Sequence, residues 1–202
     1  MLDAIGLACE RGARTLFRDL SFSLRGGELL RVAGANGSGK TSLLRILCGL
    51  LAPVSGEIRW QGTPIRMLGE EFALSLLYVG HAPAVKDDLT ASENLLFACR
   101  VAGQDPGPEE IRAALMQFGL PERDRAVRNL SQGQRRRAAL ARLALAGNVP
   151  LWLLDEPFAA LDAEGTGTVR DLIAGQLERG GMVVYSTHQE LQLEGRVISL
   201  DA

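Results

Sequence analysis

Continuous apolar runs that stop at a glycine or a polar residue recur along the chain and predict buried strands. Uninterrupted runs of this kind are typical of parallel strands that are covered on both faces. A further apolar run, residues 74–80, stops at His81, and residues 56–65 alternate apolar and polar positions around turn signals at Gly62 and Pro64, which indicates a short hairpin. The predicted buried strands lie in segments 27–34, 149–157, 180–188 and 195–200.

Apolar residues at helical intervals fill most of the chain between these strands. In residues 40–51 leucine and isoleucine recur at such intervals, and Pro53 and Gly56 are expected to end that helix. Thr90 and Glu93 form the Thr-x-x-Glu capping pattern that begins a helix. The predicted helices are 40–51, 89–103, 108–120 and 130–147, the last of which begins at Ser131 and ends at Gly147.

The order of these elements predicts an α/β fold with a mainly parallel sheet, a small antiparallel β part and an inserted helical subdomain. We expect a single domain over residues 1–202. Residues 1–80 and 146–202 would form its α/β core, and residues 81–145 would form the helical insert.

Composition narrows the class of protein. The chain has 202 residues, of which 47% are hydrophobic and 23% charged, and its net charge of −2 gives no general attraction to nucleic acid or anionic lipid. Cys9, Cys48 and Cys99 lie far apart without metal-site spacing, which favours buried thiols in a reducing compartment. No apolar run approaches the roughly 18 to 20 residues that span a bilayer, and no signal-peptide pattern is visible, so we expect a cytoplasmic protein whose membrane partners would supply any spans.

The glycine-rich loop after the first predicted buried strand matches a phosphate-binding pattern. Residues 34–41, GANGSGKT, fit G-x-x-x-x-G-K-[ST] between a strand and a helix, the context that the pattern requires. The glycines let backbone N–H groups turn toward phosphate oxygens, Lys40 would neutralise the β- and γ-phosphates, and the Thr41 hydroxyl would hold Mg²⁺. The alternative is a glycine-rich turn with a solvated lysine. The residues predicted here to bind nucleotide are Gly34, Ala35, Asn36, Gly37, Ser38, Gly39, Lys40, Thr41 and Ser42.

Two acidic residues close the predicted strand 149–157. Asp155 ends an apolar run, where a carboxylate is costly unless it faces a cation, and it would bind Mg²⁺ directly or through water. Glu156 follows toward the solvent end and is our candidate general base for the attacking water. The alternative is a pair of surface acids at a strand end.

The segment LSQGQRRR, residues 130–137, begins a helix with small and polar residues. An open helix N-terminus carries free N–H groups and attracts anions, although a capped helix without a ligand is the common explanation. Arg135, Arg136 and Arg137 are expected to form a solvated face of the helix. Nucleic-acid binding is disfavoured because the net charge is −2 and no aromatic residues interleave with the basic ones.

Together these motifs resemble the nucleotide-binding domain of ABC-type ATPases, whose fold has a P-loop NTPase core. GANGSGKT is similar to the Walker A motif, LSQGQ to the LSGGQ signature, and LWLLDE to Walker B. AALD (159–162) looks like the D-loop and STH (186–188) like the switch histidine, in the same order and over nearly the whole chain. Gln132 stands where the signature has its first glycine.

The resemblance implies that two copies pair head to tail as a homodimer when ATP is bound. Each ATP would lie between the Lys40 loop of one copy and the signature helix of the other, where Ser131, Gly133 and Gln134 bind it. Glu156, His188 and Lys40 are the implied catalytic residues. Closing on ATP and opening after cleavage would drive integral membrane transporter subunits.

His81 occupies the position of a glutamine that, in most of this family, senses Mg²⁺ and the γ-phosphate. An imidazole can donate or accept a hydrogen bond and can bind metal, so we expect His81 to keep the sensing role as a metal-site residue; a spectator histidine is the alternative. With this substitution and its flanking segments, the chain closely resembles one branch, the ATP-binding subunits of the haem exporter of c-type cytochrome maturation. Those subunits work on the cytoplasmic side of the inner membrane.

Two other functions stay open on the sequence. A non-transport ABC ATPase, such as one for iron–sulfur assembly, and an ABC exporter ATPase for another substrate carry the same motifs. A nucleic-acid-linked ABC protein is disfavoured, because only about 90 residues separate the Walker A motif from the signature.

The base-stacking position of the family also differs here. Counting back from Gly34 places Arg11 where an aromatic residue is usual, and Phe17 is the nearest substitute. A guanidinium plane can stack on a base, so Arg11 is predicted to contact the adenine, with a weaker preference for ATP over GTP.

Overall fold

The computed structural model describes residues 1–121, 125–188 and 193–200, and it divides into two compact units that are described in turn. Unit 1 comprises Met1–His81, Val149–Glu156 and Gln176–Ala202. Unit 2 comprises Ala82–Asn148 and Pro157–Gly175. The predicted division into residues 1–80 with 146–202 and residues 81–145 differs mainly in that residues 157–175 group with the helical unit.

Unit 1 contains a five-stranded parallel sheet in the order β6-β7-β8-β3-β9. The mainly parallel sheet predicted from the apolar runs is therefore present. Strand β3 lies between the two strands that come last in the sequence, and β7 lies between β6 and β8. The strands are β3 (Leu29–Ala33), β6 (Leu76–Val79), β7 (Leu151–Asp155), β8 (Met182–Ser186) and β9 (Arg196–Ser199).

A four-stranded antiparallel sheet in the order β2-β1-β4-β5 forms the second layer of unit 1. The predicted hairpin is its β4–β5 pair, which turns through Gln61 and Gly62 at φ 51° and 86°, as a two-residue hairpin loop requires. Its strands are β1 (Leu2–Arg11), β2 (Arg14–Leu24), β4 (Ser55–Trp60) and β5 (Thr63–Pro64).

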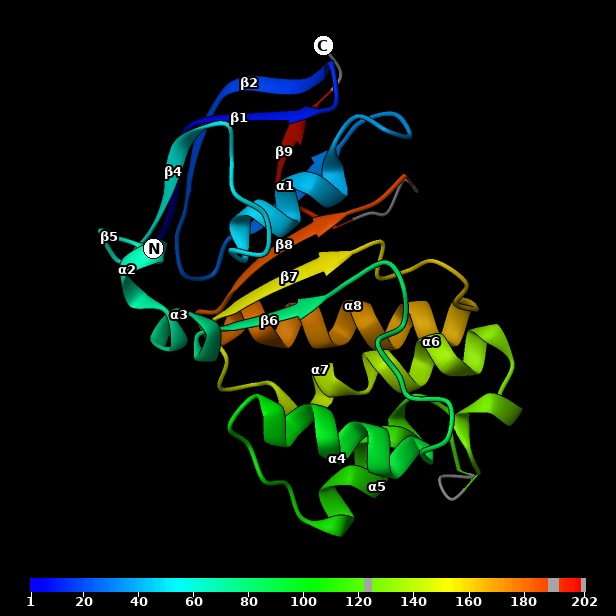
Figure 1. Cartoon of the computed structure of the whole chain (residues 1–202). Coiled ribbons are helices and arrows are strands. Elements are labelled where there is room, and N and C mark those ends of the chain that lie inside the picture. Colours follow the sequence, from blue (N-terminus) through cyan, green and yellow to red (C-terminus); the bar gives the residue numbers. More distant parts are fainter. Residues whose placement is uncertain (122–124, 189–192, 201–202) are drawn as a thin grey trace. The chain divides into compact units, whose positions relative to one another are not determined.

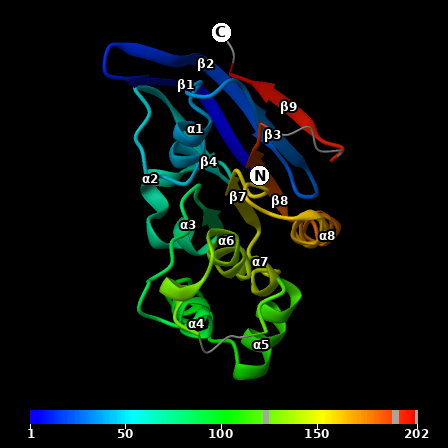
Figure 2. The same ribbon diagram turned by 90° about the vertical axis from the view of Figure 1, so that its right-hand side faces the viewer.

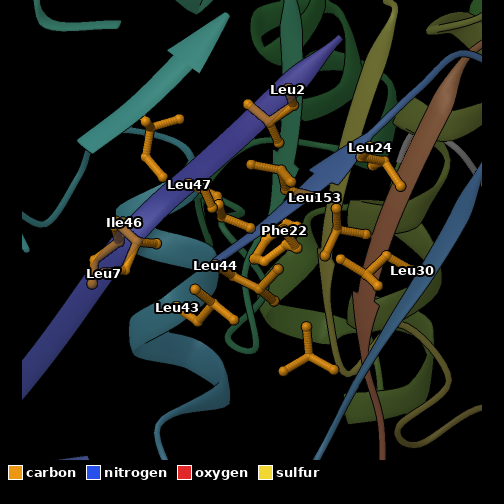
Figure 3. Close-up of a cluster of buried hydrophobic side chains, with 14 of the residues drawn as sticks. Leu2, Leu7, Phe22, Leu24, Leu30, Leu43, Leu44, Ile46, Leu47 and Leu153 are labelled. Carbon is orange, nitrogen blue, oxygen red and sulfur yellow. The ribbon is translucent and has the colours of Figure 1, made fainter. Parts of the chain in front are cut away.

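Helix α1 (Lys40–Leu47) lies between the two sheets (Figure 1). It ends four residues earlier than predicted, because Gly49 takes φ 77°, and Leu50 and Leu51 therefore turn to solvent with 68% and 38% exposure. The buried side chains of α1 pack against both sheets, as Figure 3 shows, and fully burying each contributes about 1.5–3 kcal/mol. The packed residues include Leu43, Leu44, Ile46 and Leu47 of α1, Leu2 and Leu7 of β1, Phe22 and Leu24 of β2, Leu30 of β3 and Leu153 of β7. Short helices α2 (Ile65–Leu68) and α3 (Glu70–Leu74) complete the helical part of this unit that precedes β6.

Unit 2 is helical, as predicted for the insert, and Figure 2 shows α4, α5, α6 and α7 gathered together. Thr90 caps the first of them with the predicted capping box. The single helix predicted over residues 130–147 is instead two helices joined at Ala141, which keeps right-handed helical dihedrals of −56° and −21°. The elements are α4 (Ala91–Val101), α5 (Pro108–Gln117), the 3₁₀ turn η1 (Val127–Asn129), α6 (Gln132–Leu140), α7 (Arg142–Leu145) and the greater part of α8 (Ala163–Glu178).

The three cysteines are free thiols. Cys9 and Cys99 are buried and Cys48 is half-buried, and burial raises the pKa of all three. In the part of the chain that the structure describes, no helix has both the length and the apolar character needed to cross a membrane.

Candidate active site

The glycine-rich loop joins β3 to α1 at the carboxyl edge of the parallel sheet. Gly34, Gly37 and Gly39 take φ of 144°, 81° and 110°, conformations that glycine adopts at little cost. Gly39 also lacks room for a side chain, since a Cβ there would lie 3.1 Å from Leu16 Cβ and 3.3 Å from Phe17 Cδ1. The loop therefore has the curled, closely packed backbone that the phosphate-binding pattern predicts.

Lys40 is buried at the base of this loop with 8% exposure. Its ammonium group donates to the carbonyl oxygen of Gly34 at 2.7 Å and to that of Ala35 at 3.1 Å. The amine is thus held against the loop rather than solvated, which disfavours the alternative of a surface lysine on a turn.

Asp155 ends β7 opposite Ser186 of β8, and both are buried. The Ser186 hydroxyl donates to Asp155 Oδ1 at 2.7 Å and accepts from the backbone N–H of Glu156 at 3.0 Å. Ser186 therefore fixes the carboxylate of one acidic residue and the backbone of the next. The alternative of two solvated surface acids does not fit, because Asp155 is 1% exposed and Glu156 8% exposed.

Glu156 has a left-handed backbone with φ 51°, which is uncommon outside glycine and asparagine. Its Oε2 lies 3.1 Å from Nδ1 of His188, a hydrogen-bond distance. The Glu156 side chain is 11% exposed and that of His188 is 58% exposed. The structure thus joins the predicted general base to the predicted switch histidine.

A cavity of about 490 Å³ in unit 1 brings most of the predicted residues together. Leu16 is the one lining residue that sequence reasoning did not select. The cavity is lined by Arg11, Leu16, Asn36, Gly37, Gly39, Lys40, Thr41, Ser42, His81, Asp155, Glu156 and His188.

The remaining loop residues lie close to this cavity. Gly34 and Ala35 line a second space of about 390 Å³, which shares Asn36 and His188 with the first. Arg31 and Thr187 also line it and were not predicted. The buried hydroxyl of Ser38 has no hydrogen-bond partner among the described residues.

The residues predicted to hold a metal ion all line the larger cavity. Thr41, Asp155 and His81 offer a hydroxyl, a carboxylate and an imidazole. Among the described residues there is no group of three or more histidine, cysteine, aspartate or glutamate side chains that could hold a metal by itself. The Thr41 hydroxyl and the Asp155 carboxylate fit Mg²⁺, which is usually bound through one or two protein oxygens together with waters and substrate phosphates, whereas the His81 imidazole is a ligand that transition metals prefer.

The signature residues belong to unit 2, whereas the cavity is lined by unit 1 alone. Ser131 caps α6, since its hydroxyl accepts from the N–H of Gln134 at 3.2 Å and the Gln134 side chain accepts from the N–H of Ser131 at 2.9 Å. Gly133 lies in the first turn, where an added Cβ would be 3.3 Å from the carbonyl oxygen of Ala160. The helix therefore begins with small residues, as predicted.

The solvated arginine face predicted for α6 is wrong. Arg136 is buried with 3% exposure, and Arg137 lies 3.7 Å from Asp162. Arg135 is hydrogen-bonded to several neighbours, with 31% of its side chain exposed. The stems and guanidinium groups pack within unit 2, which a count of charges along the sequence does not reveal.

Known proteins resemble this chain in sequence and in fold. The ABC transporter family model matches residues 17–159. The cytochrome c biogenesis ATP-binding export protein CcmA of Dechloromonas aromatica is 50% identical over 194 residues, which are 96% of this chain and 95% of that protein. A dimeric bacterial ABC transporter cassette has a TM-score of 0.84 at 26% identity, covering 100% of this chain and 94% of that one. The dimeric post-hydrolysis state of an ATP-binding cassette bound to ADP and Pi has a TM-score of 0.79 at 26% identity, covering 94% and 88%.

The match to the family model covers most of the chain, and the export protein is similar over nearly its full length. The predicted phosphate loop, the two strand-end carboxylates and the predicted switch histidine line the same cavity of unit 1. The chain therefore belongs to the ABC transporter family and, within it, to the cytochrome c biogenesis ATP-binding export proteins.

Proposed function

We propose that this chain is the ATP-hydrolysing subunit of a membrane complex for c-type cytochrome maturation, and that it couples ATP binding and hydrolysis to haem export or to the release of a haem-loaded carrier. As a member of its family it is an ABC-type ATPase that binds ATP. The observation that carries the proposal is the 50% identity, over nearly the full chain, to a cytochrome c biogenesis export protein, and the meeting of the Lys40 loop with the His188–Glu156 pair in one cavity supports its hydrolytic part.

In the proposed mechanism the loop holds the triphosphate. Its backbone N–H groups and the Lys40 ammonium neutralise the phosphates, and the two carbonyl bonds of Lys40 hold the amine beside the loop in advance. Thr41 and Asp155 would hold Mg²⁺ through their oxygens, with His81 beside them in the cavity, and the ion would supply charge neutralisation for the phosphates. Arg11 lies in the same cavity as the candidate contact to the base.

Glu156 orients the attacking water and accepts its proton as general base. Its carboxylate is directed by the contact to His188 Nδ1, and its backbone is fixed by the bond from its N–H to Ser186. Because the Ser186 hydroxyl also donates to Asp155, one hydroxyl sets the position of the proposed metal-binding carboxylate relative to the residue that carries the proposed general base. Positioning of this kind supplies much of the catalysis of phosphoryl transfer.

Dimerisation and membrane partners are general features of the family, and dimeric cassettes share this fold. We infer a head-to-tail homodimer in which Ser131, Gly133 and Gln134 of one copy complete the nucleotide site of the other. From the cytoplasmic side of the inner membrane, this dimer would pass its movement to integral membrane transporter subunits. His81 would report the state of the γ-phosphate from its place in the cavity.

Two substitutions test the chemistry. Glu156→Gln keeps the size of the side chain but removes the base, so ATP binding should persist while turnover falls by about a hundredfold or more and a closed dimer accumulates. Lys40→Ala should lose ATP binding itself. Exposed Glu164→Gln, outside the cavity lining, serves as the control and should leave both measurements unchanged. Normal hydrolysis by Glu156→Gln would falsify the assignment of the base.

The membrane role requires a separate experiment. The tagged chain expressed with its own chromosomal neighbours should be recovered with integral membrane proteins and lose that association when they are deleted. Recovery only from the soluble fraction together with a scaffold protein would instead support a non-transport ATPase.

A further inference from the structure

The segment that follows His81 is bound to the segment that precedes the signature helix, within unit 2. The N–H of Val127 donates to the carbonyl of Leu89 at 2.9 Å, and the N–H of Arg128 donates to that of Asp87 at 3.0 Å. We call residues 86–90 the sensor-side segment, and we call residues 126–131 the signature approach. These backbone bonds place the two segments side by side.

Arg135, in the first two turns of α6, ties both segments to the signature helix. Its Nη1 lies 2.9 Å from Asp87 Oδ1 in the sensor-side segment. Its Nη2 donates to the carbonyl of Arg128 at 3.0 Å, and its Nε donates to that of Leu130 at 3.3 Å. The guanidinium of Arg135 therefore contacts both the sensor-side segment and the signature approach. Because Arg135 is itself a residue of α6, these contacts join the two segments to the helix that Ser131 caps.

The sensor-side segment is also fixed at both of its ends by a buried amide. Asn94 of α4 is 7% exposed, accepts from the N–H of Lys86 at 2.7 Å and donates to the carbonyl of the same residue at 3.0 Å. It also donates to the carbonyls of Leu89 and Thr90. Held in this way, the segment is a firm support against which Arg135 can orient the signature approach.

We propose that Arg135 is a positioning residue that sets the Ser131 end of α6 against the segment following His81, and so links the two nucleotide sites that one copy serves. The inference rests on the proposed function, in which His81 faces the nucleotide of its own copy and Ser131 faces that of the partner. Arginine suits the task because its planar fork donates in three directions, which lysine does not reproduce.

The adjacent ion pair provides a matched control. Arg128 Nη1 lies 2.8 Å from Asp88 Oδ1, between the same two segments, but these side chains are 62% and 87% exposed and make a single contact. Arg128→Ala removes this pair and keeps the Arg128 carbonyl to which Arg135 donates. An exposed pair of this kind contributes little.

The experiment compares Arg135→Ala, Arg135→Lys, Asp87→Asn and Arg128→Ala in the Glu156→Gln background. Binding of a fluorescent ATP analogue at protein concentrations below dimerisation should stay within twofold of the parent, since the cavity lining lies in unit 1. The protein concentration for half-maximal ATP-driven dimerisation should rise on the order of tenfold for Arg135→Ala, because several charge-assisted bonds are lost. In Arg135→Lys and in Asp87→Asn this concentration should rise, but less than in Arg135→Ala. In Arg128→Ala it should not rise.

Hydrogen exchange provides the readout that does not depend on dimers. Amides of residues 126–134 should exchange faster in Arg135→Ala and in Asp87→Asn than in Arg128→Ala, while the thermal midpoint of these variants should fall by only a few degrees, so the protein stays folded. Equal exchange and equal dimerisation in all variants would overturn the inference, as would full rescue by lysine. If the parent Glu156→Gln does not dimerise with ATP, the proposed function is wrong, and the link between the two nucleotide sites is wrong with it. If the parent dimerises and the Arg135 variants dimerise equally well, only the inference about Arg135 is wrong.

Discussion

At the scale of single residues, the chemistry of the site depends on backbone conformations that side-chain identities do not reveal. Asp155 and Glu156 are consecutive, and a regular strand would point them to opposite faces. The left-handed φ of 51° at Glu156 breaks that alternation, and both carboxylates line one cavity. The residue types at this edge were predictable from the motifs. The Ser186 hydroxyl between the two acids was not, because serine at a strand end carries no distinctive pattern.

Two glycines of the phosphate loop should differ in their tolerance of a side chain. Gly39→Ala adds a Cβ that meets Leu16 and Phe17 at 3.1 and 3.3 Å, whereas Gly37→Ala meets nothing within 4 Å. Both residues have positive φ, so each change costs about 1 kcal/mol or more in backbone strain, and Gly39→Ala adds a packing cost of about 1–3 kcal/mol. Urea unfolding should show the larger loss of unfolding free energy for Gly39→Ala, and ATP titration should show the larger loss of ATP affinity for the same variant. Equal losses would mean that the contacts with Leu16 and Phe17 are relaxed without cost.

The preference for the base should depend on Arg11. Its side chain lines the cavity, and Phe17, the other candidate, is buried with 7% exposure. We expect ATP to be hydrolysed only a few-fold better than GTP, and Arg11→Ala to raise KM for ATP by about three- to tenfold, since a cation–π contact contributes about 0.5–2 kcal/mol. Steady-state kinetics with both nucleotides provide the check. An unchanged KM in Arg11→Ala would assign the base contact to another residue.

At the scale of elements, the clearest predictions were those with a capping or glycine signal. The α4 capping box and the β4–β5 turn lie where Thr90, Glu93 and Gly62 indicated. The strands β1 and β2 were not predicted. The pairing of β1 is irregular around Gly6. There the backbone approaches Gly56 so closely that a side chain at Gly56 would overlap the carbonyl oxygens of Ile5 and Gly6. That irregularity disturbs the period of two on which strand prediction depends.

The N-cap of α4 offers a test of the helix itself. The hydroxyl of Thr90 accepts from the N–H of Glu93 at 3.1 Å, and the Glu93 carboxylate accepts from the N–H of Thr90 at 2.8 Å, which lowers the pKa of Glu93. Thr90→Ala should reduce the free energy of unfolding by about 1 kcal/mol, while Thr90→Ser, which keeps the acceptor, should lose much less. Chemical denaturation monitored by circular dichroism measures both. A loss in Thr90→Ser equal to that in Thr90→Ala would show that the methyl group matters more than the cap.

At the scale of the whole molecule, residues far apart in the sequence meet at one edge of the parallel sheet. The cavity lining extends from Arg11 of β1 to His188 after β8, and it draws on both sheets of unit 1. The order of motifs predicted which segments take part. It did not predict that residues 157–175 would group with the helical unit, because that grouping depends on contacts between distant segments.

Nucleotide binding should therefore stabilise the fold as a whole. A ligand that binds only the folded state adds about 2.7 kcal/mol to the free energy of unfolding at one hundred times its Kd. ATP should raise the unfolding midpoint of Glu156→Gln but leave that of Lys40→Ala unchanged, as thermal scans with and without nucleotide would measure. A similar rise in both variants would place the nucleotide outside the loop.

The position of β3 in its sheet has a consequence for how the protein is made. Its two hydrogen-bonded neighbours, β8 and β9, are synthesised only after all the segments of unit 2. The newly synthesised phosphate loop thus has no paired strand beneath it until β8 and β9 have been made, and long-range pairings of this kind form slowly. A nascent copy therefore lacks the supported loop that nucleotide binding needs until those two strands have emerged from the ribosome.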